Sequence, residues 1–247
     1  MARMDEKKLA GKVALVTGAT RGIGKAVAAA YAHQGAGVFI CARNPSEVEQ
    51  TVRDLRALDA QVDGCAGDVG EVNDARRIVE AALKKFGPIQ VLVNNASLVG
   101  PRVPIAEYPI EQWQDVVRVN LTGLFVATQC VLKPMMAQRQ GSIINVSSGV
   151  GRTGRARWGA YAASKFGVEG LTQTLADEVR EFGIRVNSVN PGPTRTAMRA
   201  AAYPEEDPLT LPVPEQITPL FVHLASNDSI GVTGQALEAR DWLKPAN

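Results

Sequence analysis

The sequence predicts an α/β fold, a doubly wound parallel sheet of about seven strands with helices on both faces. Short apolar runs of strand length alternate with longer runs of helical period along nearly all of the 247 residues. This alternation is typical of repeated β-α units. Polar residues and glycines follow the ends of several apolar runs. No low-complexity tract or linker divides the chain, so we expect one domain spanning residues 1–247.

The first apolar run, VALVTG, has the composition of a strand buried on both faces, as in the interior of a parallel sheet. A run of helix formers follows it, begins among glycines and stops at Gly35. The alternation then repeats toward the C-terminus. We expect strands at 13–18, 38–42, 61–69, 89–96, 141–148, 184–192 and 234–239. We expect helices at 22–34, 45–60, 71–87 and 111–136, one that carries Tyr161 and ends near Gly183, and a last one at 215–226.

Proline interrupts this pattern at three places. Residues 96–109 hold three prolines and no clear period, which predicts a loop. Pro134 lies near the end of the helical run at 111–136 and should end or kink it. Residues 193–214 are dominated by proline and charge, so we expect a mobile substrate loop with a short helix.

Composition limits the partners and the location. The net charge is +2 with interspersed signs, so neither nucleic acid nor an acidic membrane is indicated. Cys41, Cys65 and Cys130 form no CxxC pair and, like His33 and His223, have no metal-ligand spacing, so we expect no metal site. The N-terminus lacks a signal-peptide pattern, and we expect no stretch of transmembrane length. A cytoplasmic location is therefore predicted.

A glycine turn joins the first strand to the first helix. The segment TGATRGIG places Gly18, Gly22, Ile23 and Gly24 in a GxxxGxG spacing. Backbone without side chains can approach a pyrophosphate there, at the positive end of a helix. A glycine pattern alone is weak, but the strand before it and the helix after it are the context that a dinucleotide site requires. The spacing is not that of a nucleoside triphosphatase loop.

The end of the second strand indicates which dinucleotide binds. An acidic residue there would normally bind a free 2′-hydroxyl, but this chain has Ala42 followed by Arg43. Arg43 can stack on adenine and pair with a 2′-phosphate, and Arg21 can supply a second charge. The alternative is that both are ordinary solvated arginines. We therefore expect NADP(H) in preference to NAD(H).

The stretch from Ser147 to Lys165 predicts the chemical centre. If Tyr161 begins or lies within a helix, Lys165 falls four residues later on the same face, where its ammonium favours the ionised phenol. This makes Tyr161 a candidate acid or base, although the spacing also occurs by chance. Ser147 and Ser148 are both candidate partners, and the residues alone do not choose between them.

The predicted topology brings further polar residues to the same place. Ligands of doubly wound sheets bind at the carboxyl ends of the strands. The residues that follow predicted strands are the glycine turn, Asp68, Asn94, Asn95, the two serines and Pro191-Gly192. This agreement supports a catalytic role for Tyr161 more strongly than the Tyr-Lys spacing alone does.

With these residues identified, the chain resembles the short-chain dehydrogenase/reductase family over nearly its whole length, and especially its 3-oxoacyl-acyl-carrier-protein reductase type. The matching motifs are TGATRGIG, Asp68-Val69, NNA at 94–96, Asn120 within VNL, Ser148, Tyr161-x-x-x-Lys165 and Pro191-Gly192. The resemblance implies a single-domain Rossmann fold. It also selects Ser148, because the family's serine lies thirteen residues before its tyrosine.

The resemblance implies a catalytic tetrad. Tyr161 would donate a proton to a carbonyl as the nicotinamide delivers hydride, and Ser148 would hydrogen-bond the same oxygen. Lys165 would hold the ribose hydroxyls and, with the nearby nicotinamide charge, lower the pKa of the phenol. Asn120 would carry a water that links Lys165 to solvent. The substrate would be a small-molecule carbonyl compound or secondary alcohol.

The resemblance also implies the cofactor contacts and the assembly. Asp68 and Val69 would flank adenine, Asn95 would approach the ribose, and Thr194 and Thr196 would meet the carboxamide or the phosphates. Pro191 and Gly192 would also contact the cofactor. A homotetramer is implied, with the helix after Glu111 and the helix of Tyr161 as interface elements.

Three departures from the family pattern limit this transfer. Ser97 replaces a glycine and could narrow the cofactor floor; the C-terminus LEARDWLKPAN puts C-terminal packing in doubt. The loop GRTGRARWG could select anionic or bulky substrates, although an ordinary solvated loop is the simpler interpretation. The competing function is a catalytically silent NADP-binding regulator or scaffold, which would have no need for the Ser, Tyr and Lys set. Chain length and glycine spacing disfavour an epimerase, and the Tyr-Lys gap disfavours an enoyl reductase.

Overall fold

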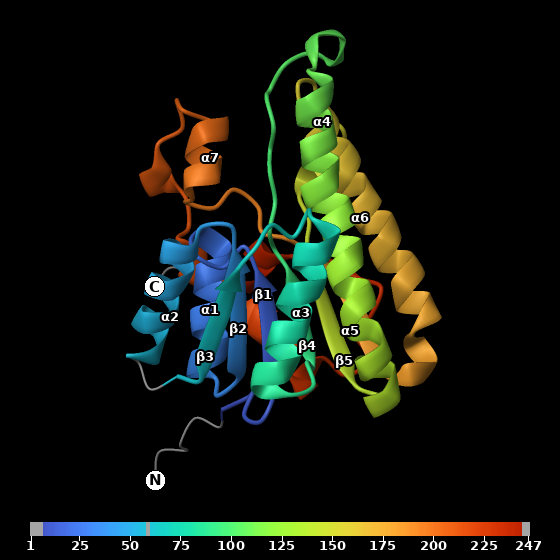
Figure 1. Ribbon diagram of the computed structural model, residues 1–247. Coiled ribbons are helices and arrows are strands. Elements are labelled where there is room, and N and C mark those ends of the chain that lie inside the picture. Colours follow the sequence, from blue (N-terminus) through green and yellow to red (C-terminus); the bar gives the residue numbers. More distant parts are fainter. Residues whose placement is uncertain (1–6, 58–59, 244–247) are drawn as a thin grey trace.

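The computed structural model describes residues 7–57 and 60–243, and a seven-stranded, wholly parallel sheet runs through its centre (Figure 1). The strand order is β3-β2-β1-β4-β5-β6-β7. The strands are β1 Val13–Thr17, β2 Gly37–Ala42, β3 Val62–Ala66, β4 Val91–Asn94, β5 Gly141–Val146, β6 Ile184–Asn190 and β7 Ala236–Glu238. The order reverses direction between β1 and β4, which is the place where such sheets bind ligands. The predicted doubly wound fold is confirmed.

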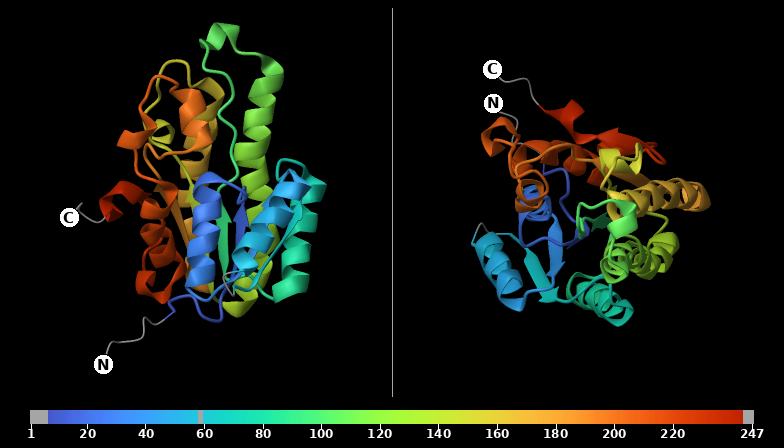
Figure 2. Two further views of the ribbon diagram at one scale, coloured as in Figure 1. Left: turned by 90° about the vertical axis from the view of Figure 1, so that its left-hand side faces the viewer. Right: turned by 90° about the horizontal axis from the view of Figure 1, so that it is seen from above.

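Helices cover both faces of the sheet and bury two apolar layers (Figure 2). They are α1 Gly22–His33, α2 Pro45–Arg56, α3 Val72–Phe86, α4 Ile110–Val117, α5 Leu124–Gln138, α6 Gly159–Glu178, α7 Ala197–Ala202 and α8 Thr218–Ala225. One layer contains α1 and α8, with Tyr31 and Phe221 fully buried. The other packs α3, α5 and α6 on the opposite face, with Met135 fully buried.

The helical run predicted at 111–136 is real but is not uniform. A π-helical segment, Arg118–Gly123, lies between α4 and α5. We expected Pro134 to end or kink this run, and it does not end it, because α5 includes Pro134 and continues to Gln138. The carbonyl four residues before the proline is the one left without its bond, and a proline near the end of a helix removes only that bond.

The same run corrects another expectation. Ile110–Gln138 spans 29 residues and is, by length and composition, apolar enough to cross a membrane, although we expected no such stretch. Half of its most apolar window is buried inside the fold, where α5 packs against α3, β4 and β5 and α4 packs against α6. Packing in the core therefore accounts for the buried half of this window.

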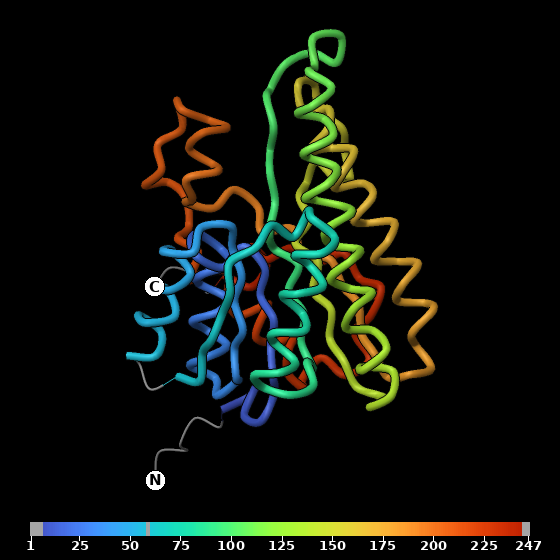
Figure 3. Tube along the Cα trace, viewed as in Figure 1, coloured from blue at the N-terminus to red at the C-terminus, as the bar shows by residue number. Residues whose placement is uncertain are grey.

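Other boundaries shift by a few residues. The helix α6 ends at Glu178, and a short 3₁₀ turn leads to Gly183, whose left-handed conformation closes the segment. The helix α2 ends at Arg56, whereas we expected 60; residues 58–59 lie outside the described part. The 193–214 loop contains the expected short helix, α7. In Figure 3 this segment and the 96–109 loop both rise above the carboxyl ends of the strands.

Candidate active site

A cleft of about 1520 Å³ lies along the carboxyl ends of the strands. It extends from the glycine turn and the end of β2 to the Tyr161 helix and α7. Twelve of the predicted site residues line it: Gly18, Arg21, Gly22, Ile23, Arg43, Asp68, Val69, Asn95, Tyr161, Lys165, Pro191 and Thr196. Gly24, Asn120, Ser148, Gly192 and Thr194 do not line it. The sheet thus brings both halves of the predicted site to one cleft.

The glycine turn is packed too closely to hold side chains. Gly18 has a φ of +64°, and a Cβ there would lie 2.8 Å from Ala96 Cα. A Cβ on Gly24 would lie 2.4 Å from the carbonyl oxygen of Gly18. Asn95 holds the turn, because its side-chain amide donates to the carbonyl oxygens of Thr17 and Gly18 at 2.9 and 3.0 Å. Asn95 therefore lines the cleft and also fixes its floor.

Two cations face the cleft here, Arg21 at the start of α1 and Arg43 directly after β2. Arg21 and Arg43 are exposed, and neither forms a salt bridge with any residue in the described ranges. Asn44 turns the chain there, since its side chain accepts from the backbone of Ser46 and Glu47 and caps α2. The guanidinium groups are thus free to bind an anion on this side of the cleft.

Asp68 and Val69, which follow β3, form part of the cleft wall. The Asp68 carboxylate accepts from the backbone of Gly70 at 2.9 Å and from Arg118 at 3.1 Å. Val69 is buried and presents an apolar surface. The pair offers a flat, mostly apolar contact with a fixed carboxylate beside it.

Tyr161 lies at the opposite end of the cleft, near the start of α6. Only 9% of its surface is exposed, and the Trp158 ring packs on it at 5.5 Å. Burial raises the pKa of the phenol, and the nearby hydroxyls of Ser148 and Ser97 partly oppose that rise. Burial therefore keeps Tyr161 a protonated phenol at neutral pH in the protein alone. The expected lowering of the phenol pKa, which involves the nicotinamide charge as well as Lys165, stays a prediction.

Lys165 follows one helical turn later and is also buried. Its Nζ donates to the carbonyl oxygen of Val146 at 2.8 Å and lies 5.5 Å from the centre of the Tyr161 ring. Burial lowers the pKa of Lys165 to about 8, and the Glu169 carboxylate opposes that fall. A buried lysine whose pKa lies near neutrality is sensitive to any charge placed beside it.

Asn120 sits behind these residues in the π-helical segment. Its amide donates to the Leu98 carbonyl at 2.8 Å and to Ser164 Oγ at 3.0 Å, and its oxygen accepts from the Leu98 backbone at 2.7 Å. Single π turns are frequent at functional sites because they free backbone carbonyls. The sequence pattern could not reveal this turn, since its apolar period matches that of an α-helix.

The two serines after β5 face different surroundings. Ser147 lines the cleft, and its buried Oγ has no hydrogen-bond partner among the described residues. Ser148 is the one whose hydroxyl lowers the pKa of Tyr161, and it accepts a long 3.4 Å bond from the Val150 backbone. The hydroxyl beside the phenol is thus Ser148.

The loop after β6 closes the far side. Thr194 is buried and its hydroxyl donates to the carbonyl oxygens of Pro191 and Gly192, so it stabilises the turn. Thr196 lines the cleft and caps α7 by accepting from the Arg199 backbone. Of the two threonines expected to contact the cofactor, Thr194 therefore stabilises the turn, and Thr196 lines the cleft.

Sequence reasoning missed a clamp over the Tyr161 end. The Arg102 guanidinium packs against the rings of both Trp158 and Tyr203, 4.7 and 4.6 Å from their centres, and the two ring centres are themselves 5.9 Å apart. It also bonds the carbonyl oxygen of Ala202 in α7. The 96–109 loop, the turn before α6 and the substrate loop thereby meet at one arginine. No sequence signal links these residues, since they are far apart in the chain.

The arginine-rich loop has mixed roles. Arg157 lines the cleft, whereas Arg155 is exposed and outside it. Arg152 turns away from the cleft into an ion pair with Glu169. The proposal that this loop selects substrate therefore does not extend to Arg152.

The C-terminal segment contributes to the same region. Glu238 accepts from the Asn190 side chain at 2.8 Å, and Arg240 donates to the Pro193 carbonyl at 2.8 Å. The residues that depart from the family pattern thus hold the loop after β6. No group of three or more His, Cys, Asp or Glu suited to a metal occurs in the described part of the chain.

Comparison with known proteins agrees with this geometry. The family model described as short chain dehydrogenase matches residues 12–207. An uncharacterized oxidoreductase of Escherichia coli K12, YciK, is 38% identical over 242 residues, covering 95% of this chain and 94% of that protein. A 3-oxoacyl-(acyl-carrier-protein) reductase of Thermotoga maritima is 38% identical and covers 93% and 96%.

A solved short chain dehydrogenase of Escherichia coli CFT073, complexed with NADPH, superposes with a TM-score of 0.91 at 39% identity and covers 95% of this chain and 99% of its own. One of Shigella flexneri, complexed with NADP, gives 0.91 at 38% identity, with 95% and 99% coverage. The fold, the cleft and these relatives agree. The chain belongs to the short-chain dehydrogenase family of oxidoreductases, which act on CH–OH and C=O groups.

Proposed function

We propose that this protein is an NADPH-dependent reductase of ketones that also oxidises the corresponding secondary alcohols. The observation that carries the proposal is the buried Tyr161 phenol, with the Ser148 hydroxyl beside it and Lys165 one helical turn away. A phenol that stays protonated is suited to donate a proton to a carbonyl oxygen. The 3-oxoacyl reductase relative supports a ketone as the substrate class.

The cleft fits a phosphorylated dinucleotide. A Cβ on Gly18 or Gly24 would clash with neighbouring protein atoms, so glycine allows the tight turn that brings backbone N–H groups to a pyrophosphate at the start of α1. Arg21 and Arg43 offer unpaired guanidinium groups for a 2′-phosphate. The NADP and NADPH complexes of two structural neighbours support this choice. Asp68 and Val69 would flank adenine. The buried Ser147 hydroxyl has no hydrogen-bond partner among the described residues and could bond a polar atom of the cofactor.

NADPH supplies the hydride when it is bound. Tyr161 donates its proton to the carbonyl oxygen, and Ser148 hydrogen-bonds that oxygen as negative charge develops. Lys165 stabilises the phenolate left behind, because a nearby cation favours the ionised form. Asn120 bonds the Leu98 segment and, through Ser164, the first part of α6, and so helps to hold the reacting groups in place.

The test is the Tyr161→Phe variant. Loss of the proton donor should reduce ketone reduction by about 10²- to 10⁴-fold. NADPH binding, measured by the change in cofactor fluorescence, should persist. Tyr108→Phe is the matched control, since its hydroxyl lies outside the cleft lining and has no partner among the described residues.

Activity is read on a panel of ketones, ketoesters and acyl thioesters, each with NADPH and NADH. Near-normal turnover by Tyr161→Phe would contradict the proposal. Tight NADPH binding by the unmodified protein with no turnover on the whole panel would instead favour a silent, NADP-binding regulator.

A further inference from the structure

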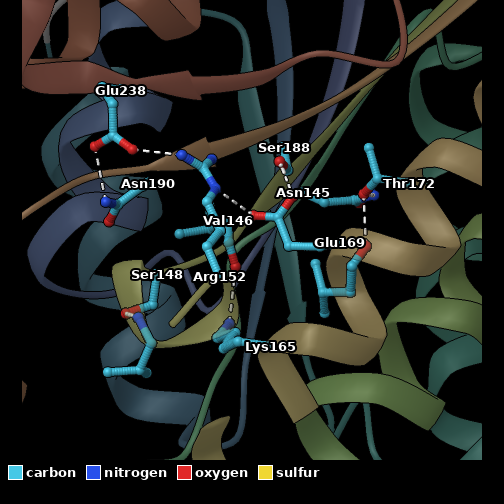
Figure 4. Close-up of polar contacts among 12 residues, drawn as sticks. Asn145, Val146, Ser148, Arg152, Lys165, Glu169, Thr172, Ser188, Asn190 and Glu238 are labelled. Carbon is cyan, nitrogen blue, oxygen red and sulfur yellow. Dashed lines mark hydrogen bonds and ion pairs between the residues drawn. The ribbon is translucent and has the colours of Figure 1, made fainter. Parts of the chain in front are cut away.

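A polar network joins the helix of Tyr161 and Lys165 to the loops on either side of it (Figure 4). Glu169 is one helical turn beyond Lys165 and is only 7% exposed. Its carboxylate accepts from Arg152 Nε at 3.1 Å and from Ser188 Oγ at 2.6 Å. Ser188 is fully buried on β6. A carboxylate buried in this way needs such partners, because an unpaired charge there is costly.

The network continues to the loop that borders the cleft. Arg152 also forms an ion pair with Glu238 on β7. The other oxygen of Glu238 accepts from the Asn190 side chain at 2.8 Å, and Asn190 in turn accepts from the Gly192 backbone at 3.0 Å. One chain of bonds therefore runs from α6 to the Pro191-Gly192 turn.

Close packing holds the turn before Arg152 against the same helix, α6. Arg152 follows the short turn Gly149–Gly151, directly after Ser148. A Cβ on Gly151 would lie 2.8 Å from Lys165 Cβ and 2.9 Å from its carbonyl carbon. The turn that carries Ser148 thus rests on the backbone of Lys165, and the bond from Arg152 to Glu169 secures it one helical turn further on.

We propose that Arg152 and Glu169 are a positioning pair for the reaction, which hold the Ser148 turn on α6 and set the charge that Lys165 experiences. This inference rests on the proposed function, in which Lys165 acts as a cation. In this role Arg152 does not touch the substrate. It acts from the side of the Ser148 turn that faces away from the cleft.

The charges around Lys165 give the sign of the effect. The titratable and charged groups facing this part of α6 are Tyr161 and Glu169 from the helix, Arg152 from the turn after β5, and Glu238 from β7. Glu169 opposes the fall in the pKa of Lys165 that burial causes. Arg152 partly neutralises Glu169. Removing the Glu169 carboxylate should therefore lower the pKa of Lys165, and removing the Arg152 guanidinium should raise it.

The decisive experiment compares Glu169→Gln with Arg152→Gln by direct titration of Lys165. Carbon-13 NMR of the lysine ε-methylene, assigned with Lys165→Arg, follows its protonation without any turnover. We expect Glu169→Gln to lower the midpoint by about one pH unit and Arg152→Gln to raise it, given the size of charge interactions one helical turn apart inside a protein. Asp177→Asn is the control, an exposed carboxylate on the same helix, and should leave the midpoint unchanged.

Kinetics provide the second measurement. The alkaline limb of kcat/KM for ketone reduction should move down in pH for Glu169→Gln and up for Arg152→Gln, and Arg152→Lys should restore it. Shifts in the same direction for both variants, or no shift in either, would overturn the proposal. If Glu169→Gln does not fold, as judged by thermal unfolding, Glu169→Asp takes its place and should keep the midpoint near that of the unmodified protein; a midpoint lowered as far as expected for the lost charge would count against the pair. Absence of turnover in the unmodified protein would refute the proposed function, while the NMR titration would still decide this inference.

Discussion

Lys165 is the residue whose protonation should govern the pH dependence of the enzyme. Its pKa of about 8 is lowered from the ordinary value by burial, so the ammonium is present below pH 8 and is lost above it. Burial raises the pKa of Tyr161, which therefore stays protonated across this range. We expect kcat/KM for ketone reduction to be level near neutrality and to fall above about pH 8, as kcat/KM reports groups of the enzyme before substrate binds.

The measurement is a pH–rate profile of ketone reduction in buffers of constant ionic strength. Lys165→Met should lower activity throughout and remove the alkaline limb. A wild-type profile that stays level to pH 10 would show that another group controls protonation in this range.

Arg43 should decide which dinucleotide is preferred. It lies on the cleft wall directly after β2, and the acidic lining residue that follows it, Glu47, already accepts from the Thr20 hydroxyl at 3.0 Å. Arg43→Ala should reduce kcat/KM with NADPH by about 10- to 100-fold, the loss expected for a charge-assisted hydrogen bond. Activity with NADH should change little, because NADH has no 2′-phosphate.

Steady-state kinetics with both cofactors check this expectation. Arg53→Ala is the matched control, since Arg53 is exposed on α2 and, among the described residues, its guanidinium pairs with the helix neighbours Glu49 and Gln50. An equal loss with NADPH and NADH would exclude a specific contact to the 2′-phosphate.

At the scale of elements, the clamp formed by Arg102, Trp158 and Tyr203 should control how firmly the substrate loop covers the cleft. Arg102 packs against both rings and bonds the end of α7. Cation–π contacts of this kind contribute about 0.5–2 kcal/mol each. Arg102→Ala should therefore raise KM for the ketone by roughly 10-fold and change kcat little, because the reacting residues lie on other elements.

Arg155→Ala is the control, as an exposed arginine of the neighbouring loop that lies outside the cleft. Limited proteolysis of the 193–214 loop gives a second measurement and should be faster in Arg102→Ala. An unchanged KM together with unchanged proteolysis would mean that the clamp does not hold the loop.

At the scale of the whole molecule, we predict a homotetramer that uses α4, α5 and α6. Phe125 on α5 and Phe166 on α6 are 46% and 47% exposed, and Ile110 at the start of α4 is 59% exposed. Large apolar side chains on neighbouring helices are typical of a surface that another subunit covers. The Phe125→Glu/Phe166→Glu double variant should dissociate, as measured by light scattering.

Val72→Glu is the control for this prediction, because Val72 is a comparably exposed apolar residue at the start of α3, outside the proposed interface. A monomer of the unmodified protein at working concentration would count against the assembly.

The sequence by itself determined the features that depend on local pattern. The alternation of apolar and amphipathic runs predicted every strand, because strand and helix periods are properties of neighbouring residues. The glycine turn and the four-residue spacing of Tyr161 and Lys165 are local in the same way. Parallel topology then brought the strand ends, and with them most of the predicted site residues, to one edge.

Only the tertiary structure decided the contacts that cross the chain. Arg152 and Glu238 are 86 residues apart, and Arg102 and Ala202 are 100 apart, so no pattern in the sequence links either pair. Burial also decided the directions of the Tyr161 and Lys165 pKa shifts, since desolvation depends on what packs around a group rather than on its neighbours in sequence. The chemistry of the site could be predicted from residue types, but its charge balance could be seen only once the chain was folded.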